Sequence, residues 1–227
     1  MALQTETLGS YRTRVLRELR DASQQYFNNQ NSATPFADID FWINQGAQWT
    51  DMWSKGSRSY RPNVPTTVGI DQYDLRTLFP NDTVLDIATL WLIYGSFRVQ
   101  LAEAAFSDVT NLARPWLNFQ NVPAVYCRYG ASSVFIATAP AGPYVVDWDV
   151  VVLSPPMVLP TDPYALPYPY TEPVPKYAAY LAKQYQRRHD EAELFYAEAV
   201  RALNDIEGAR VGQMPQISTT ASRGSRS

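Results

Sequence analysis

Side chains able to act as nucleophiles, bases or metal ligands are sparse in this 227-residue sequence, which holds one histidine and one cysteine. His189 would have to serve as the base for any imidazole-activated nucleophile. It stands between charged residues where two helices are expected to meet, and an exposed first-turn residue fits that position better. Cys127 lies in an apolar run, where cysteine usually packs as a small hydrophobic residue. A lone cysteine also rules out an intrachain disulfide and Cys₂ or Cys₄ metal sites.

Asp147 and Asp149 are a pair of carboxylates whose spacing could support shared chemistry. Residues two apart in a strand point to the same face, and two close carboxylates can share a proton or a metal. No third carboxylate or histidine stands nearby in the sequence, and dinucleotide-binding, P-loop and zinc-protease motifs are missing. Alternating charge on a solvent-facing strand is the commoner arrangement. We predict no catalytic residue, no metal site and no cofactor.

Charge and hydropathy argue against duplex DNA as a tightly bound partner and against a membrane-spanning segment. The formal net charge is -3 and the pI is near 5.2, so no basic field is available to hold duplex DNA tightly. The most apolar stretch, Ile87 to Tyr94, is far shorter than the roughly 20 residues needed to span a bilayer. The segment from Met1 to Leu16 does not have the composition of a signal peptide. We expect a soluble intracellular protein.

Amphipathic helices are predicted near the start of the chain. Apolar residues recur at steps of three and four from Leu8 to Tyr26, and the polar run from Asn28 to Ser32 should end that helix. A second helix should begin near Thr34–Pro35 or Asp38 and end at Gly56. Its apolar face includes the tryptophans at positions 42, 49 and 53 and is wide, which predicts burial on two sides.

Two more helices are predicted near the end of the chain. The first should be capped by Thr171, with Pro173 and Pro175 in its opening turn. The second should carry apolar residues from Ala192 to Ile206 on one face and stop at Gly208.

The middle of the chain has a β pattern between proline and glycine breaks. The expected strands are residues 73–75, 84–94, 98–101, 124–129, 133–137 and 144–153, with a helical turn or two spanning Phe106, Val109 and Leu112. The last three strands have the spacing of an antiparallel meander. From Ser154 to Pro175 the chain carries eight prolines interleaved with tyrosines, which predicts a stiff, extended connector.

Two helical pairs that cannot bury their apolar stripes alone predict an α+β fold with a four-helix core built from both ends of the chain. An antiparallel β domain would be inserted between them, and an extended C-terminal tail would follow. The predicted organisation is a helical core module at 1–60 and 170–208, a β-rich insertion at 61–155, a Pro/Tyr-rich connector at 156–169 and a C-terminal arm at 209–227.

Taken in order, several segments resemble the head-to-tail adaptor, or connector, proteins of tailed bacteriophages. The resemblance runs from about Tyr11 to Gly208 and rests on the segments FADIDFWINQGAQ, QYDL, NVPAVYCRYG, SVFIATAPAGPYVVDWDVVVLSPP and VPKYAAYLAKQYQRRHDEAELFYAEAVRAL. The roles of Val64 to Thr67 and of the proline-rich connector are not explained by it.

The resemblance implies a structural protein of the virion neck, made in the host cytoplasm and without contact to a membrane. Its partners would be the portal protein, a tail or nozzle protein, and copies of itself in a ring of typically twelve. Genomic double-stranded DNA would pass through the ring without sequence-specific binding. The portal-binding residues would be Arg210, Met214, Ile217, Arg223 and Arg226, and the inter-subunit residues Trp49 and Trp53.

Three alternatives remain open. The chain could be another neck or tail-completion protein of the same particle, which differs only in its neighbours. It could be a small hydrolase that uses Asp147, Asp149 and His189. It could also be a binding module that presents its proline- and tyrosine-rich segment to a recognition domain.

Overall fold

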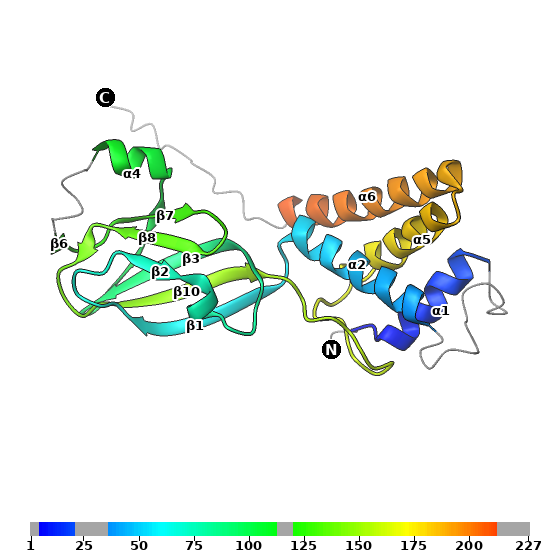
Figure 1. Cartoon of the computed structure of the whole chain (residues 1–227), viewed down its shortest axis with the longest axis horizontal. Coiled ribbons are helices and arrows are strands. Elements are labelled where there is room, and N and C mark those ends of the chain that lie inside the picture. Colours follow the sequence, from blue (N-terminus) through cyan, green and yellow to red (C-terminus); the bar gives the residue numbers. More distant parts are fainter. Residues whose placement is uncertain (1–4, 21–35, 113–119, 213–227) are drawn as a thin grey trace, which may run out of the picture.

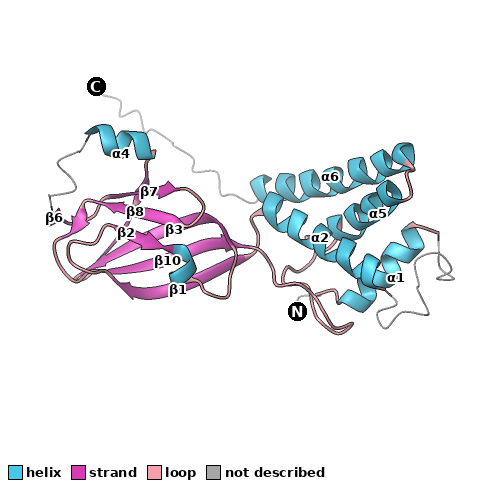
Figure 2. Ribbon diagram, viewed as in Figure 1, coloured by secondary structure: helices cyan, strands magenta, loops and turns pink. Residues whose placement is uncertain are grey.

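Helices from the two ends of the sequence lie together, and strands from its middle form a separate group of β-sheets beside them (Figure 1). This computed structural model describes residues 5–20, 36–112 and 120–212. Figure 2 shows the same division by type of secondary structure. The predicted mixed α and β class with antiparallel sheets is confirmed.

The helical module comprises α1 (Leu8–Glu18), α2 (Ala37–Ser54), α5 (Pro173–Tyr185) and α6 (His189–Gly212). Helix α5 contacts each of the other three, and α2 also contacts α1 and α6. The buried residues of this module include Leu8, Tyr11 and Val15 of α1, which belong to the predicted stripe.

Helix α1 starts and stops through local hydrogen bonds. Its N-terminus has a capping box, in which the Ser10 amide donates to Thr7 Oγ1 and the Thr7 amide to Ser10 Oγ. It ends at Glu18, and Arg20 follows in a left-handed conformation with φ 58°. The predicted stop at Asn28 to Ser32 is therefore wrong, because backbone geometry ends the helix before the polar run; residues 21–35 lie outside the described part of the chain.

Two glycines predicted to stop helices do not do so. Helix α2 ends at Ser54, and Lys55, rather than Gly56, takes the left-handed conformation with φ 47°. Helix α6 continues through Gly208 to Gly212. A glycine inside a helix costs only about 1 kcal/mol relative to alanine, which the packing of a long helix can offset.

The sequence predicted the start of helix α5 only in part. Pro173 occupies its first turn as predicted, but the residue before it, Glu172, is the N-cap and makes no side-chain capping bond. Thr171 is buried instead. Proline at the first position already removes an amide that would need a partner, so a side-chain cap is less necessary.

The proline-rich connector runs over the helical module and contributes to its core. Met157, Tyr164 and Leu166 are buried in the same apolar cluster as α1, α2 and α5. The chain between β10 and α5 contains turns and one isolated bridge, from Thr7 to Pro163. From Ser154 to Glu172 the segment has neither a helix nor a regular strand, as predicted. The expected stiff, extended course is wrong, because turns fold the segment back and its buried side chains make it part of the helical module.

The β module has two four-stranded sheets and a short two-stranded one, in the orders β1-β10-β3-β4, β2-β8-β7-β5 and β6-β9. Its strands are β1 (Arg58–Pro65), β2 (Gln72–Asp74), β3 (Val84–Tyr94), β4 (Phe97–Gln100), β5 (Ala102–Glu103), β6 (Gln120–Asn121), β7 (Val125–Tyr129), β8 (Ser133–Ala137), β9 (Ala139–Pro140) and β10 (Val145–Val152). Two short helices, α3 (Leu75–Leu78) and α4 (Phe106–Leu112), complete it. The pairs β5–β7 and β6–β9 are parallel and the others antiparallel.

The predicted meander of the last three strands is wrong. Strands β7 and β8 pair with each other, but β10 leaves them and lies between β1 and β3 in the other large sheet.

Strand β1 was not predicted because Pro62 and Pro65 look like breaks. It is an edge strand whose pairing with β10 shifts between Arg61 and Val64, and an edge tolerates proline.

The two large sheets share one apolar core. Leu90 of β3 and Trp148 of β10 contribute from one sheet, and Tyr126 and Ile136 from the other. On β10 the predicted apolar face, Val146 to Val152 in steps of two, is buried throughout. The helical core and this β core are separate clusters among the described residues, and the chain crosses between them near Ser57 and Ser154.

Candidate functional site

The two aspartates of β10 serve to join strands. Asp147 is buried and accepts hydrogen bonds from Tyr60 Oη at 2.9 Å, the Asn63 amide at 2.9 Å and Arg98 Nη2 at 3.1 Å. Arg98 reaches it across β3, over the ring of Trp91. The predicted solvent-facing role is wrong for Asp147, because long side chains of the neighbouring strands cover it.

The candidate catalytic residues are not brought together. Asp149 pairs with Arg58 at 2.9 Å in the β module. His189 is exposed at the start of α6, as predicted, with Nδ1 2.8 Å from Gln184 Oε1. Within the described ranges, no group of three or more His, Cys, Asp or Glu side chains could hold a metal ion.

Cys127 is a core residue, as predicted. It is fully buried in β7, in a cluster with Val109 and Ala137. Burial raises the pKa of its thiol, which disfavours the reactive thiolate.

An aromatic cluster joins α2, α5 and α6. The ring of Trp49 is buried and stacks on Tyr177 at 4.4 Å between centroids, and it lies 6.1 Å from Tyr196. Trp53, one turn later on α2, is 60% exposed although its ring centroid is only 6.3 Å from that of Trp49. Of the two predicted inter-subunit residues, Trp53 is thus the more exposed, while Trp49 lies mostly beneath the surface.

Trp53 forms one wall of a groove between α2 and α6. The Trp53 groove has a volume of about 260 Å³ and is lined by Trp49, Trp53, Tyr196, Val200, Leu203, Asn204 and Glu207. Its lining is mainly apolar, and polar side chains stand at one end. This composition suits an apolar protein segment better than a charged small molecule.

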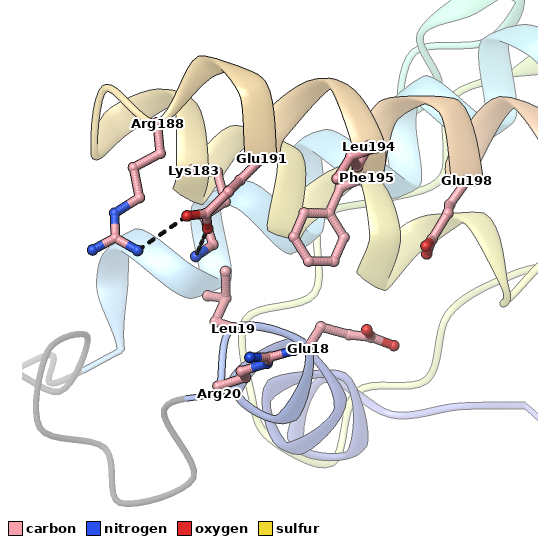
Figure 3. A pocket seen from close by; sticks show the side chains of 9 residues that line it. All are labelled: Glu18, Leu19, Arg20, Lys183, Arg188, Glu191, Leu194, Phe195 and Glu198. Carbon is pink, nitrogen blue, oxygen red and sulfur yellow. Dashed lines mark hydrogen bonds and ion pairs between the residues drawn. The ribbon is translucent and has the colours of Figure 1, made fainter.

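A larger pocket of about 410 Å³ lies between α1, α5 and α6, and its lining side chains are drawn in Figure 3. Its charges are largely paired. Lys183 Nζ lies 2.6 Å from Glu191 Oε2, and Arg188 Nη1 lies 3.3 Å from Glu191 Oε1. The hydrogen bond from Lys183 lowers the pKa of Glu191. These contacts connect helices and leave little uncompensated charge for a ligand.

Lys176 of α5 makes two further ion pairs between the same helices. Its Nζ lies 2.9 Å from Glu18 of α1 and 2.8 Å from Glu198 of α6. One cation thus joins three helices.

The predicted portal-binding residues fall at or beyond the end of α6. Arg210 belongs to the last turns of the helix, but its side chain lies outside the described part of the structure. The described part of the structure also excludes Met214, Ile217, Arg223 and Arg226.

Comparison with known families decides what kind of protein has this architecture. The family model of the SU10 adaptor protein matches residues 7–223. The chain belongs to the SU10 adaptor protein family. The adaptor resemblance predicted from the order of the segments is confirmed, and the match extends past Gly208 into the C-terminal segment. Membership makes this adaptor a structural protein of the bacteriophage head-to-tail connection.

A second comparison and the helices themselves add limits. No curated protein matches the adaptor sequence. Across the described ranges, none of the adaptor's helices combines the length and apolarity needed to cross a membrane.

Sequence reasoning missed the buried polar contact that connects the two modules of the adaptor. Asp51 of α2 accepts hydrogen bonds from the Ser154 amide at 2.7 Å and from Tyr164 Oη at 2.9 Å. Burial raises the pKa of Asp51 and outweighs these bonds. A single aspartate on the apolar face of a predicted helix was the available signal, since such a residue must find partners.

Proposed function

We propose that this adaptor forms a ring between the portal and the tail of a bacteriophage. The observation that carries the proposal is the family match over residues 7–223. The arrangement of the chain supports it: a helical module and a β module lie at opposite ends of the molecule, so one subunit offers two separate surfaces (Figure 1). A connector between two different rings needs two such surfaces.

The helical module is the proposed portal side. We infer that α1, α2, α5 and α6 act as one four-helix core and that the residues after Gly212 form an extended arm. Arg210, Met214, Ile217, Arg223 and Arg226 would bind the portal, and the β module would face the tail or nozzle protein. The arm has no acidic residue, so its arginines are free to pair with acidic groups of the partner.

Copies of the adaptor would assemble side by side, in a ring of twelve. The exposure of Trp53 supports a contact between neighbouring subunits, with Trp49 beneath it as a rigid support. Genomic DNA would pass through the lumen, and a net charge of -3 per subunit would keep DNA from adhering to the wall. The finished protein would reside in the virion neck after synthesis in the host cytoplasm.

Light scattering of the adaptor with and without isolated portal rings tests this function. We expect a complex whose mass corresponds to a portal ring with a full ring of adaptors. A chain that neither forms rings nor binds portal rings would rule the proposal out. Binding to tail components but not to the portal would instead favour another neck or tail-completion protein.

Truncation after Gly212 tests the arm separately, because it spares all of α6. We expect lost portal docking with an unchanged circular dichroism spectrum. Unchanged docking would exclude a portal-binding role for the residues beyond Gly212.

A further inference from the structure

The 157–162 loop presents two adjacent aliphatic side chains to solvent. Val158 is 71% exposed and Leu159 58%, although the residue before them, Met157, is buried in the helical core. Isolated exposed apolar residues are common, but two neighbours at the tip of a fixed loop indicate a contact site.

Side chains fix the shape of this loop. The amide of Met157 donates to Asn44 Oδ1 at 2.8 Å, and Asn44 Nδ2 donates to the Met157 carbonyl at 3.0 Å. The carboxylate of Asp162 accepts from the amides of Val158 at 2.8 Å and Leu159 at 2.7 Å. Asp162, the last residue of the loop, therefore holds the loop closed.

The start of α1 holds the other side of the loop. The Gly9 amide donates to the Pro160 carbonyl at 2.9 Å, and the Leu8 amide to the Asp162 carbonyl at 3.0 Å. A β-carbon on Gly9 would lie 3.1 Å from the Pro160 oxygen, so glycine permits this close approach. A loop held in this way loses little conformational entropy when it binds, which favours its use as a docking element.

The Trp53 groove has matching chemistry. Its volume is about 260 Å³, and Trp49, Trp53, Tyr196, Val200 and Leu203 make its lining mainly apolar. The side chains of valine and leucine together contain seven carbons and no polar atom, so they form a small apolar insert. Aromatic walls with an aliphatic insert are typical of the central, desolvated part of a protein interface.

Loop and groove lie on different sides of the helical module. In Figure 1, α6 follows one edge of the module, and the yellow-green chain segment that contains the loop projects from the opposite edge. One copy therefore cannot fill its own groove with its own loop. Two different patches on opposite sides of one subunit make a heterologous contact, which generates a ring when the rotation between copies closes.

We propose that the 157–162 loop of one adaptor docks, through Val158 and Leu159, into the Trp53 groove of the next copy in the ring. The proposal rests on the ring of the proposed function and identifies its subunit contact. Leu159 fills the groove between Trp53 and Val200, and Val158 covers its rim.

Disulfide trapping between two proteins that each carry one introduced cysteine tests the pairing. Full-length Leu159→Cys and Val200→Cys proteins are mixed under mild oxidation, alone at high concentration and on portal rings, and non-reducing gels and intact mass measure the mixed dimer. The native Cys127 is buried and stays in place. Val99→Cys, at an exposed position of the β module, replaces Leu159→Cys in the matched control.

We expect the Leu159–Val200 dimer to exceed the control by at least tenfold in one of the two settings. A yield equal to the control in both settings would overturn the loop-to-groove contact. Docking of the wild-type adaptor on portal rings is measured in parallel, so rings without the Leu159–Val200 dimer would reject this contact and leave the proposed function intact.

A substitution provides the second measurement. Leu159→Asp should weaken association between copies by roughly tenfold or more, because it places a charge in an apolar groove. Leu194→Asp, at a similarly exposed leucine outside the loop and the groove, should have no such effect. Equal association of both variants with the wild type would contradict the proposal.

Discussion

At the scale of single residues, Asp51 connects the parts of the adaptor. Its carboxylate binds Ser154, the second residue after β10, and the buried tyrosine of the connector, Tyr164. Both donors are buried. The Tyr164 hydroxyl also lies within hydrogen-bond distance of the Ala47 carbonyl, at 3.3 Å, so the Ser154 amide depends on Asp51 more than Tyr164 does.

Replacement of Asp51 by alanine should lower the free energy of unfolding by about 1–3 kcal/mol, because it leaves the buried Ser154 amide without its acceptor, while the Tyr164 hydroxyl can still donate to the Ala47 carbonyl. Asp51→Asn keeps an oxygen acceptor and should cost less. Urea unfolding followed by circular dichroism measures both. Equal stability of Asp51→Ala and wild type would show that water or the Ala47 carbonyl satisfies these donors.

The raised pKa of Asp51 predicts a dependence of stability on pH. Between the ordinary value of 3.8 and the raised pKa, the folded state keeps a proton that the unfolded chain has released. The contribution of Asp51 to stability is therefore greatest below pH 3.8 and falls as the pH rises through the raised pKa. Urea unfolding from about pH 3.5 to about pH 7 should show wild type losing stability relative to Asp51→Asn. A relative gain with rising pH would contradict the sign of this shift.

At the scale of elements, two glycines inside helices have opposite surroundings. A β-carbon on Gly46 of α2 would lie 2.7 Å from the Val174 carbonyl of α5, whereas one on Gly208 of α6 would meet nothing within 4 Å. The first glycine permits close helix packing, and the second lies in an exposed stretch of helix.

Gly46→Ala should destabilise the adaptor by about 1–3 kcal/mol, because separating α2 from α5 costs more than the gain in helix propensity. Thermal unfolding at several scan rates checks this. An unchanged midpoint would mean that α5 can shift without loss.

Gly208→Ala should stabilise the adaptor by up to about 1 kcal/mol, because alanine is a better helix former and the position is open. Thermal unfolding measures this gain in stability as well. If Gly208 ended the helix in a left-handed conformation, alanine would destabilise the protein instead.

At the scale of the whole molecule, two large cores share one chain. Leu90 lies in the β core and Ile43 in the helical core, and both are fully buried. Either truncation to alanine should cost about 2–5 kcal/mol in its own module.

Hydrogen exchange measured by mass spectrometry should separate the two modules. Leu90→Ala should speed exchange mainly between residues 57 and 153, and Ile43→Ala mainly in α1, α2, α5 and α6. Equal acceleration everywhere by either variant would show that the adaptor unfolds as a single cooperative unit.

The sequence by itself determined the elements whose signal is local. The short β-type runs Val84–Tyr94 and Ser133–Ala137, set off by breaks, predicted β3 and β8 to the residue, and the spacing of Phe106, Val109 and Leu112 predicted α4. The order of these segments along the chain was sufficient to indicate the adaptor family, and the surroundings of Cys127 and His189 were predicted correctly.

Only the tertiary structure decided which segments meet. Strand β10 leaves its sequence neighbours for β1 and β3, and the proline-rich connector packs into the helical core, because burial of apolar surface depends on distant partners. For the same reason, the sequence could name Trp49 and Trp53 together but could not separate them. Packing against Tyr177 and Tyr196 buries Trp49, and the position of α6 leaves Trp53 exposed beside a groove.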